Sequence, residues 1–199
     1  MRGPLAAAMI DSAPEDMTDD GRGRATADRV TAIIGLGSNV EPERHLGEAV
    51  RALRAAAALD VLAVSSAWAT PAVGPAGQPP FLNAAVLVAT TLPAPVLRSE
   101  VLRPIESALG RVRTEDRYAP RTIDLDLVTY GTGRLHIDGR EIPDPDLAFQ
   151  AFLAVPAAEV APGWLHPVTG VPLARLAADL LSRLPEYERP RRLAISLEG

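Results

Sequence analysis

Apolar and polar residues follow two periods between residues 30 and 184, an alternation typical of strands and a three-to-four-residue repeat typical of helices. Runs of apolar, β-prone residues predict strands over 30–36, 60–68, 84–91 and 122–128. Apolar residues at helical spacing predict helices that begin at Pro42 and that span 95–109, 147–155 and 173–184. A short hairpin is expected over 135–142.

The order of these segments, strand–helix–strand followed by strand–helix–strand, predicts the fold class. Two such units side by side give an α+β ferredoxin-like sandwich, an antiparallel β-sheet with flanking helices, which we expect on one face of the sheet. The predicted domain spans residues 30–184. Residues 1–29 lack a sustained period and are expected to form a disordered N-terminal tail. The Pro- and Arg-rich residues 185–199 are expected to fray.

Composition narrows the possible functions. A hydrophobic content of 47% and a net charge of -5 indicate a soluble globular protein without the basic excess of a nucleic-acid-binding protein. There is no cysteine, which excludes disulfides and thiol chemistry. No apolar run approaches the roughly 18 residues of a membrane span, so we expect no membrane association and a cytoplasmic location. All 20 basic residues are arginine, so any phosphate site must be built from arginine.

The strongest candidate chemistry lies in residues 111–130. Four arginines fall within its first eleven residues: Arg111, Arg113, Arg117 and Arg121. Asp124 and Asp126 then alternate with apolar residues, which predicts that both carboxylates point to one face of a strand. Two neighbouring carboxylates suit Mg²⁺, and arginines suit phosphate oxygens. A solvated strand beside a charged loop is the alternative for a lone Asp-x-Asp.

Two further segments carry candidate features. Residues 34–39, IGLGSN, predict a tight strand-to-helix turn; they lack the third glycine of a dinucleotide fingerprint and are not a Walker A loop. Residues 70–80 contain four prolines and two glycines, which predicts a surface loop long enough to act as a lid. Phe81 at its end either packs in the core or stacks on a flat ring whose polar edges pair with Asn83.

The motifs resemble those of the 6-hydroxymethyl-7,8-dihydropterin pyrophosphokinase family, in order and spacing, over roughly residues 31–182. The matching pieces are IGLGSN at 34–39, Ser65-Ser66, Thr70-Pro71, Gly74-Pro75, FLNAAV at 81–86, Ile105-Glu106, GRVR at 110–113 and RYAPRTIDLDL at 117–127.

This resemblance implies an ATP-dependent pyrophosphokinase of folate biosynthesis. Such an enzyme transfers pyrophosphate from ATP to 6-hydroxymethyl-7,8-dihydropterin and gives the pterin diphosphate and AMP. It implies that two Mg²⁺ ions are held by Asp124 and Asp126, and that the catalytic residues are Arg111, Arg121, Asp124 and Asp126. The implied pterin-binding residues are Thr70, Val73, Phe81, Asn83 and Phe152. The implied ATP-binding residues are Arg103, Glu106, Arg113, Arg117, Tyr118 and Leu127.

Two positions depart from the family pattern. Asp144 stands where relatives usually have histidine between two prolines, and Gln150 stands where they usually have arginine. Both usual residues lie near the ATP phosphates, so we expect weaker ATP binding or compensation by a neighbouring arginine, Arg134 and Arg140 being the nearest in sequence.

The alternatives belong to other functional classes. A degenerate relative could bind pterin or nucleotide without turnover. An RRM-like nucleic-acid module shares the fold, but the acidic Asp124–Asp126 face and the negative net charge argue against it. The expected partners are therefore small-molecule substrates, ATP and the pterin, with no nucleic acid and no membrane, and a monomer is expected.

Overall fold

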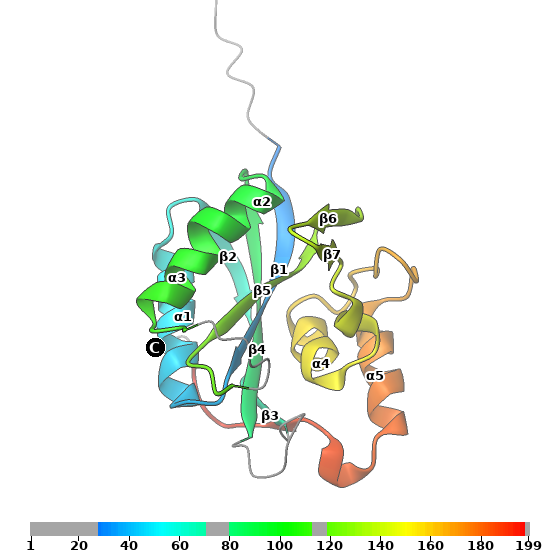
Figure 1. The fold of residues 1–199 in the computed structure, drawn as a ribbon. Coiled ribbons are helices and arrows are strands. Elements are labelled where there is room, and N and C mark those ends of the chain that lie inside the picture. Colours follow the sequence, from blue (N-terminus) through cyan, green and yellow to red (C-terminus); the bar gives the residue numbers. More distant parts are fainter. Residues whose placement is uncertain (1–27, 71–79, 113–118, 198–199) are drawn as a thin grey trace, which may run out of the picture.

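The computed structural model describes residues 28–70, 80–112 and 119–197, and it places an antiparallel sheet between two groups of helices (Figure 1). The sheet strands are β1 Val30–Ser38, β2 Leu59–Val64, β3 Trp68–Thr70, β4 Phe81–Thr90, β5 Asp124–Tyr130 and β8 Arg191–Arg192. Their order is β5-β1-β4-β3-β8, and β2 pairs with the far half of β4. The neighbours β5-β1-β4-β2 give the predicted ferredoxin-like arrangement, which is confirmed.

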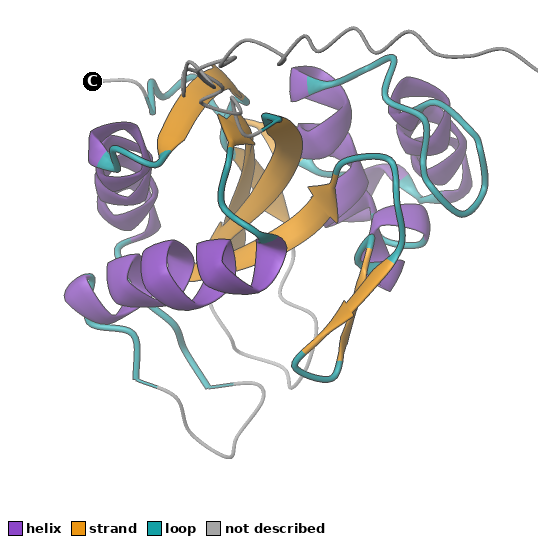
Figure 2. Cartoon of the chain, turned by 90° about the horizontal axis from the view of Figure 1, so that it is seen from above, coloured by secondary structure: helices purple, strands orange, loops and turns teal. Residues whose placement is uncertain are grey.

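Helices cover both faces of the sheet, whereas the sequence predicted helices on one face (Figures 1 and 2). One face carries α1 Pro42–Ala55 and a second helix composed of α2 Ala94–Val96, the π-helix η1 Leu97–Leu102 and α3 Arg103–Ala108. The other face carries α4 Ala151–Val160 and α5 Leu173–Arg183. Shorter segments are the hairpin β6 Leu135–Ile137 and β7 Arg140–Ile142, and the 3-10 helices η2 Pro145–Ala148 and η3 Glu186–Glu188.

Two hydrophobic layers explain why helices lie on both faces. Ala32, Ile34 and Leu36 of β1 point into a core shared with α1 and η1. The intervening Ile33 points to the opposite side and packs in a second core with Leu153 of α4. Because β1 is buried on both faces, its apolar run is continuous, and a second helical layer is required to cover it.

The helix after β4 is widened at its centre. The Arg103 N–H bonds to the carbonyl oxygen of Arg98, five residues back, as in a π-helix. Pro104 follows directly, and a proline inside a helix has no N–H and crowds the carbonyl four residues earlier. The wide turn accommodates the proline and brings Arg98 and Arg103 to one carboxylate, that of Asp138 in the hairpin.

The glycine segment is strand, not the predicted turn. Gly35 and Gly37 lie within β1, which pairs with β4 as far as Ser38 and with β5 as far as Gly37. A Cβ on Gly35 would lie 3.0 Å from the side chains of Leu153 and Val128, so glycine here allows α4 to pack close to the sheet. The chain turns later, at Glu41, which has a left-handed φ of 42° and precedes α1.

The C-terminal segment differs from the expected frayed end. Strand β8 pairs with β3, the Leu193 N–H donates to the Ala67 carbonyl at 2.9 Å, and Leu197 is buried. Pairing with β8 covers the edge of β3 that would otherwise remain open. The predicted N-terminal tail, residues 1–29, lies almost wholly outside the described residues. Within the described part of the chain, every helix is too short or too polar to span a bilayer.

Candidate active site

Asp124 and Asp126 lie on one face of β5, as predicted. Leu125 and Leu127 of the same strand point into the core under α1, so the two carboxylates point to the side that carries α4. In the register of the sheet Asp124 is opposite Gly37 and Asp126 is opposite Gly35. Leu153 and Val128 fill the space above Gly35, whereas a Cβ on Gly37 would meet only Asn83 Oδ1, at 3.4 Å.

Two arginines hold Asp124. The Arg121 Nη1 donates to Asp124 Oδ2 at 2.7 Å, and the Arg111 Nε lies 3.6 Å from Asp124 Oδ1. All three side chains are largely buried. Ion pairs in such a setting are screened less than surface pairs, so this cluster keeps two guanidinium groups beside the metal-ligand candidate.

Asp126 has a different environment. Its Oδ1 accepts a hydrogen bond from Arg140 Nη1 of the hairpin. Partial burial of this carboxyl and the neighbouring charge of Asp124 raise its pKa to about 6. The positive charge of Arg140 opposes this rise, and a bound divalent cation would oppose it further.

The donor set suits Mg²⁺. In the part of the chain that the structure describes, no group of three or more His, Cys, Asp or Glu side chains could hold a metal ion. The protein therefore offers the two carboxylates of Asp124 and Asp126, and water and phosphate oxygens would complete the shell. Mg²⁺ is characteristically bound in that way, through one or two carboxylates and substrate phosphates.

Asn39 fixes the backbone of Arg121, a role that the sequence analysis missed. The Asn39 N–H donates to the Arg121 carbonyl at 3.2 Å, and the Arg121 N–H donates to Asn39 Oδ1 at 2.8 Å. Asn39 is 5% exposed and lies just beyond β1. These two bonds link residues 82 positions apart. In the sequence, Asn39 was marked only as the last residue of the IGLGSN motif.

The predicted pterin residues cluster on β3 and β4 beside the carboxylates. Asn83 is opposite Gly37, whose other neighbour in the sheet is Asp124. The Asn83 Nδ2 donates to Thr70 Oγ1 at 2.8 Å, and Phe81 is opposite Thr70 in the sheet. The Arg121 Cζ lies 5.7 Å from the centre of the Phe81 ring, within cation–π distance.

Phe152 comes from α4 and is partly buried against the second core. It therefore lies on the same side of the sheet as Asp124 and Asp126. Phe81 is partly exposed, which leaves ring surface free for a ligand.

Val73, the remaining predicted pterin residue, lies outside the described residues, as does most of the predicted proline-rich lid.

The predicted ATP residues differ in their exposure. Arg103 is half exposed and donates to Asp138 at 3.2 Å. Glu106 is buried and accepts from the Leu125 N–H at 2.9 Å, so it braces the strand that carries the carboxylates. The Leu127 side chain is in the core, and only its backbone could contact a ligand. The other three, Arg113, Arg117 and Tyr118, lie outside the described residues.

The two departures lie between the hairpin and α4, Asp144 just before η2 and Gln150 just before α4. The Asp144 N–H donates to the Val128 carbonyl at 2.8 Å, and Asp144 Oδ1 accepts from the Asp146 N–H at 2.9 Å. Burial raises the pKa of Asp144, and nearby Arg140 opposes that rise. Gln150 is exposed at the start of α4, where its N–H donates to the Asp146 carbonyl at 2.7 Å.

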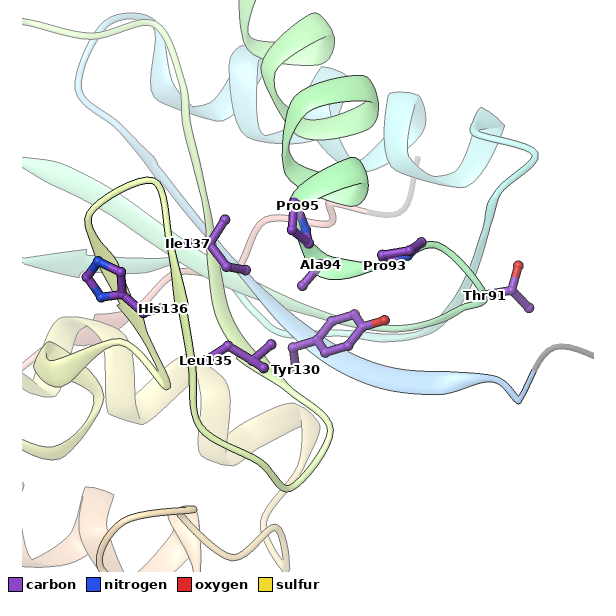
Figure 3. Close-up of a pocket in the computed structure, with 8 residues that line it drawn as sticks. All are labelled: Thr91, Pro93, Ala94, Pro95, Tyr130, Leu135, His136 and Ile137. Atoms are coloured by element: carbon purple, nitrogen blue, oxygen red, sulfur yellow. The ribbon is translucent and has the colours of Figure 1, made fainter.

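A separate pocket of about 450 Å³ lies at the other end of β5 (Figure 3). It is lined by Thr91, Pro93, Ala94, Pro95, Tyr130, Leu135, His136 and Ile137. None of the catalytic, substrate-binding or metal-binding residues predicted from the sequence lines this pocket. Its lining includes neither a carboxylate nor an arginine. This pocket is therefore not the phosphate-binding part of the site.

Comparison with known proteins points to one family. The model of the 7,8-dihydro-6-hydroxymethylpterin-pyrophosphokinase (HPPK) family matches residues 33–162. A 2-amino-4-hydroxy-6-hydroxymethyldihydropteridine pyrophosphokinase of Synechocystis is 37% identical over 146 residues, which cover 73% of this chain and 73% of the relative. Proteins of the same name from Methylorubrum extorquens and Haemophilus influenzae are 41% and 33% identical, covering 66% and 80% of this chain and 82% and 96% of those proteins.

Solved structures share the fold. A Plasmodium falciparum HPPK-DHPS triple mutant with SDX-DHP superimposes with a TM-score of 0.62 at 12% identity, covering 83% of this chain and 47% of that one. An HPPK-DHPS in complex with substrates gives a TM-score of 0.64 at 10% identity, covering 84% of this chain and 47% of that one. This chain thus spans about half the length of these solved chains.

Proposed function

This chain belongs to the 7,8-dihydro-6-hydroxymethylpterin-pyrophosphokinase family, and we infer from its membership and its site that it transfers pyrophosphate from ATP to 6-hydroxymethyl-7,8-dihydropterin. It is an ATP-dependent diphosphotransferase of folate biosynthesis, and its small-molecule substrates are ATP and the pterin alcohol. Its family uses ATP as co-substrate and typically Mg²⁺.

One observation carries the assignment of the site. A single row across three strands contains Asn83, Gly37 and Asp124, so the predicted pterin amide and a predicted metal ligand lie on one face of the sheet with a glycine between them. A pyrophosphoryl transfer requires this adjacency, because the pterin alcohol must reach a phosphorus of the metal-bound nucleotide.

Asp124 and Asp126 are the proposed ligands of two Mg²⁺ ions, with phosphate and water oxygens completing each shell. When bound, the ions neutralise phosphate charge and align the attacking and leaving oxygens. Two carboxylates on one strand face, one of them with a raised pKa, support this assignment.

Arg111 and Arg121 are the proposed catalytic arginines. Both guanidinium groups already lie at Asp124, so they are in place to stabilise charge that develops on the phosphoryl oxygens. In the transfer, the hydroxymethyl oxygen bonds to the β-phosphorus of ATP as that phosphorus separates from the oxygen it shares with the α-phosphate, and AMP leaves. Arg113 and Arg117 are proposed to contact the nucleotide from the same arginine-rich segment.

Phe81 and Phe152 are proposed to stack on the two faces of the pterin, while Asn83, Thr70 and Val73 pair with its polar edges. The contact of Asn83 with Thr70 orients the amide and supports this role. Aromatic rings from a strand and from α4 on the same side of the sheet suit a flat heterocycle.

Leu127 and Glu106, two of the remaining proposed ATP contacts, lie along the outer edge of β5. The Leu125 N–H points away from β1 toward Glu106, so strand alternation turns the backbone of Leu127 outward as well. The backbone of Leu127, between the bonded residues Leu125 and Val128 of the edge, is proposed to pair with the adenine ring. Arg103, Glu106 and Tyr118 are proposed to border this nucleotide site. A monomeric state, a cytoplasmic location and a domain over residues 30–184 stay predictions.

The decisive assay measures AMP released from ATP. We expect AMP to form only when Mg²⁺ and 6-hydroxymethyl-7,8-dihydropterin are both present, in equal amount to the pterin diphosphate. Binding of both substrates without AMP release would contradict turnover and would favour the degenerate relative considered from the sequence.

A further inference from the structure

Arg140 is held at the metal-ligand candidates by two anchors on its own hairpin. On one side, Asp138 in the turn accepts from Arg98 Nη1 at 2.7 Å and from Arg103 Nη2 at 3.2 Å. On the other side, the Asp144 N–H donates to the Val128 carbonyl of β5 at 2.8 Å. These bonds fix the first residue of β7 beside β5, and from there Arg140 reaches Asp126.

The contact of Arg140 leaves much of its guanidinium available. Its side chain is 45% exposed, and within the described residues its only hydrogen bond or ion pair is the one from Nη1 to Asp126. Guanidinium has five N–H donors, and one partner leaves most of them free to bind another anion. The side chain is also long enough to turn without moving the hairpin.

The charges around Arg140 favour a polyanion only when a metal ion is present. Burial and the nearby positive charges of Arg140 and Arg103 lower the pKa of Arg98, so three arginines gather at this edge of the site. Asp126 and Asp144 lie among them and would repel phosphates by themselves. Arg98 and Arg103 share Asp138, so neutralising Asp126 with a divalent cation leaves Arg140 as the arginine that has lost its partner.

We propose that Arg140 is a polyphosphate-binding residue with two partners. It neutralises Asp126 in the metal-free protein, and its guanidinium moves to the ATP phosphates once Asp126 binds Mg²⁺. The inference rests on the proposed function, because it takes Asp126 as a metal ligand. A divalent ion competes successfully with a monovalent guanidinium for one carboxylate. The released guanidinium then meets phosphate oxygens bound to the same ion, for which its planar fork is well matched.

The exchange predicts effects of opposite sign, which separate it from a merely structural ion pair. In Arg140→Gln, Mn²⁺ should bind the nucleotide-free protein severalfold more tightly, because no counter-ion competes for Asp126. The same variant should bind ATP with Mg²⁺ at least fivefold more weakly, because a phosphate contact is lost. Electron paramagnetic resonance of free Mn²⁺ measures the first quantity, and calorimetric titration of ATP with excess Mg²⁺ measures the second.

Two variants serve as controls. Arg134→Gln removes an exposed arginine just before the hairpin and should change neither quantity. Arg140→Lys keeps the charge and should recover part of the ATP affinity. An ATP affinity of Arg140→Gln within twofold of the parent would overturn the proposal, and so would weaker binding of both Mn²⁺ and ATP, since that would indicate a disturbed hairpin. Absence of pterin-dependent AMP release by the parent would instead refute the proposed function, whereas the Mn²⁺ measurement would still report the pairing of Arg140 with Asp126.

Discussion

At the scale of single residues, Asp126 combines an unfavourable environment with a role in binding. Its carboxyl is partly buried beside Asp124, and its pKa is raised to about 6. The folded protein therefore holds this proton more tightly than the unfolded chain, so stability falls as the pH rises from about 4 through about 6. Groups that are strained in this way concentrate at functional sites.

Asp126→Asn should therefore separate stability from activity. Above about pH 6 the metal-free variant should unfold at a temperature roughly 2–4 °C higher than the parent, a gain of about 1 kcal/mol after allowance for solvent screening. Turnover should fall by orders of magnitude. Calorimetric scans of metal-free protein and AMP assays provide the two measurements. A variant that is less stable than the parent at pH 7, or within tenfold of its turnover, would remove Asp126 from this role.

Asn39→Ala should impair catalysis through Arg121. Without Oδ1 the Arg121 N–H loses its partner, which should destabilise the protein by about 1–3 kcal/mol and lower kcat at least tenfold. The KM for each substrate should change far less, because Asn39 is assigned no substrate contact. Thr90→Val is the matched control: the Thr90 Oγ1 accepts from the Leu92 N–H at the far end of β4, so it should lose stability and keep kcat. Equal kcat in both variants would leave Asn39 with a structural role only.

Phe81→Ala and Phe152→Ala should each weaken pterin binding by about 1–3 kcal/mol, the loss of one aromatic stack and its buried area. ATP affinity should change little. Phe149→Ala is a suitable control, because Phe149 is 72% exposed and only three residues from Phe152. Fluorescence titration with the pterin provides the affinities. Titrations of the first two variants that overlay the parent would place the pterin elsewhere.

At the scale of elements, local patterns predicted where strands and helices lie but not how they end. The period-2 alternation placed Asp124 and Asp126 on one face correctly, because one side of β5 is buried and the other open. Gly35 and Gly37 suggested a turn, since glycine favours turns in isolation. Gly35 instead allows α4 to pack close to the sheet through Leu153, which is 118 residues away in sequence. The π-helix before Pro104 was also not predictable, because the spacing of apolar residues does not reveal a widened helical turn.

The loop after α4 provides a pH-dependent test of an element. His166 is 3% exposed, and its Nδ1 accepts from the Val168 N–H at 3.2 Å and the Thr169 N–H at 3.3 Å. Burial lowers the pKa of His166, and protonation of Nδ1 would break both bonds. The unfolded chain binds the proton more readily, so stability should fall as the pH drops below about 6.5.

Urea unfolding between about pH 5 and pH 7 measures this dependence. His166→Asn, whose side-chain oxygen can replace Nδ1 as acceptor, should flatten the slope over that interval. A slope that persists in His166→Asn would assign the acid sensitivity to other groups.

At the scale of the whole molecule, the sheet brings together residues that the sequence separates. The ferredoxin-like order was predictable because it follows from the sequence of strands and helices alone. The second helical layer was not, because α4 carries little amphipathic pattern and is buried on several sides. Arg140 and Asn39 gain their importance from long-range contacts with Asp126 and Arg121, and no local motif marks either contact. Asn83 and Asp124, which motifs do mark, lie in one row of the sheet on either side of Gly37.

The central claim is that this surface transfers the β- and γ-phosphoryl groups together to the pterin alcohol. The most direct measurement uses ATP radiolabelled at the β-phosphorus, incubated with Mg²⁺ and 6-hydroxymethyl-7,8-dihydropterin, with separation of pterin products from nucleotides. We predict that the label moves wholly into the pterin product while unlabelled AMP is released in equal amount. Label retained in ADP, with only the γ-phosphoryl group on the pterin, would contradict the account.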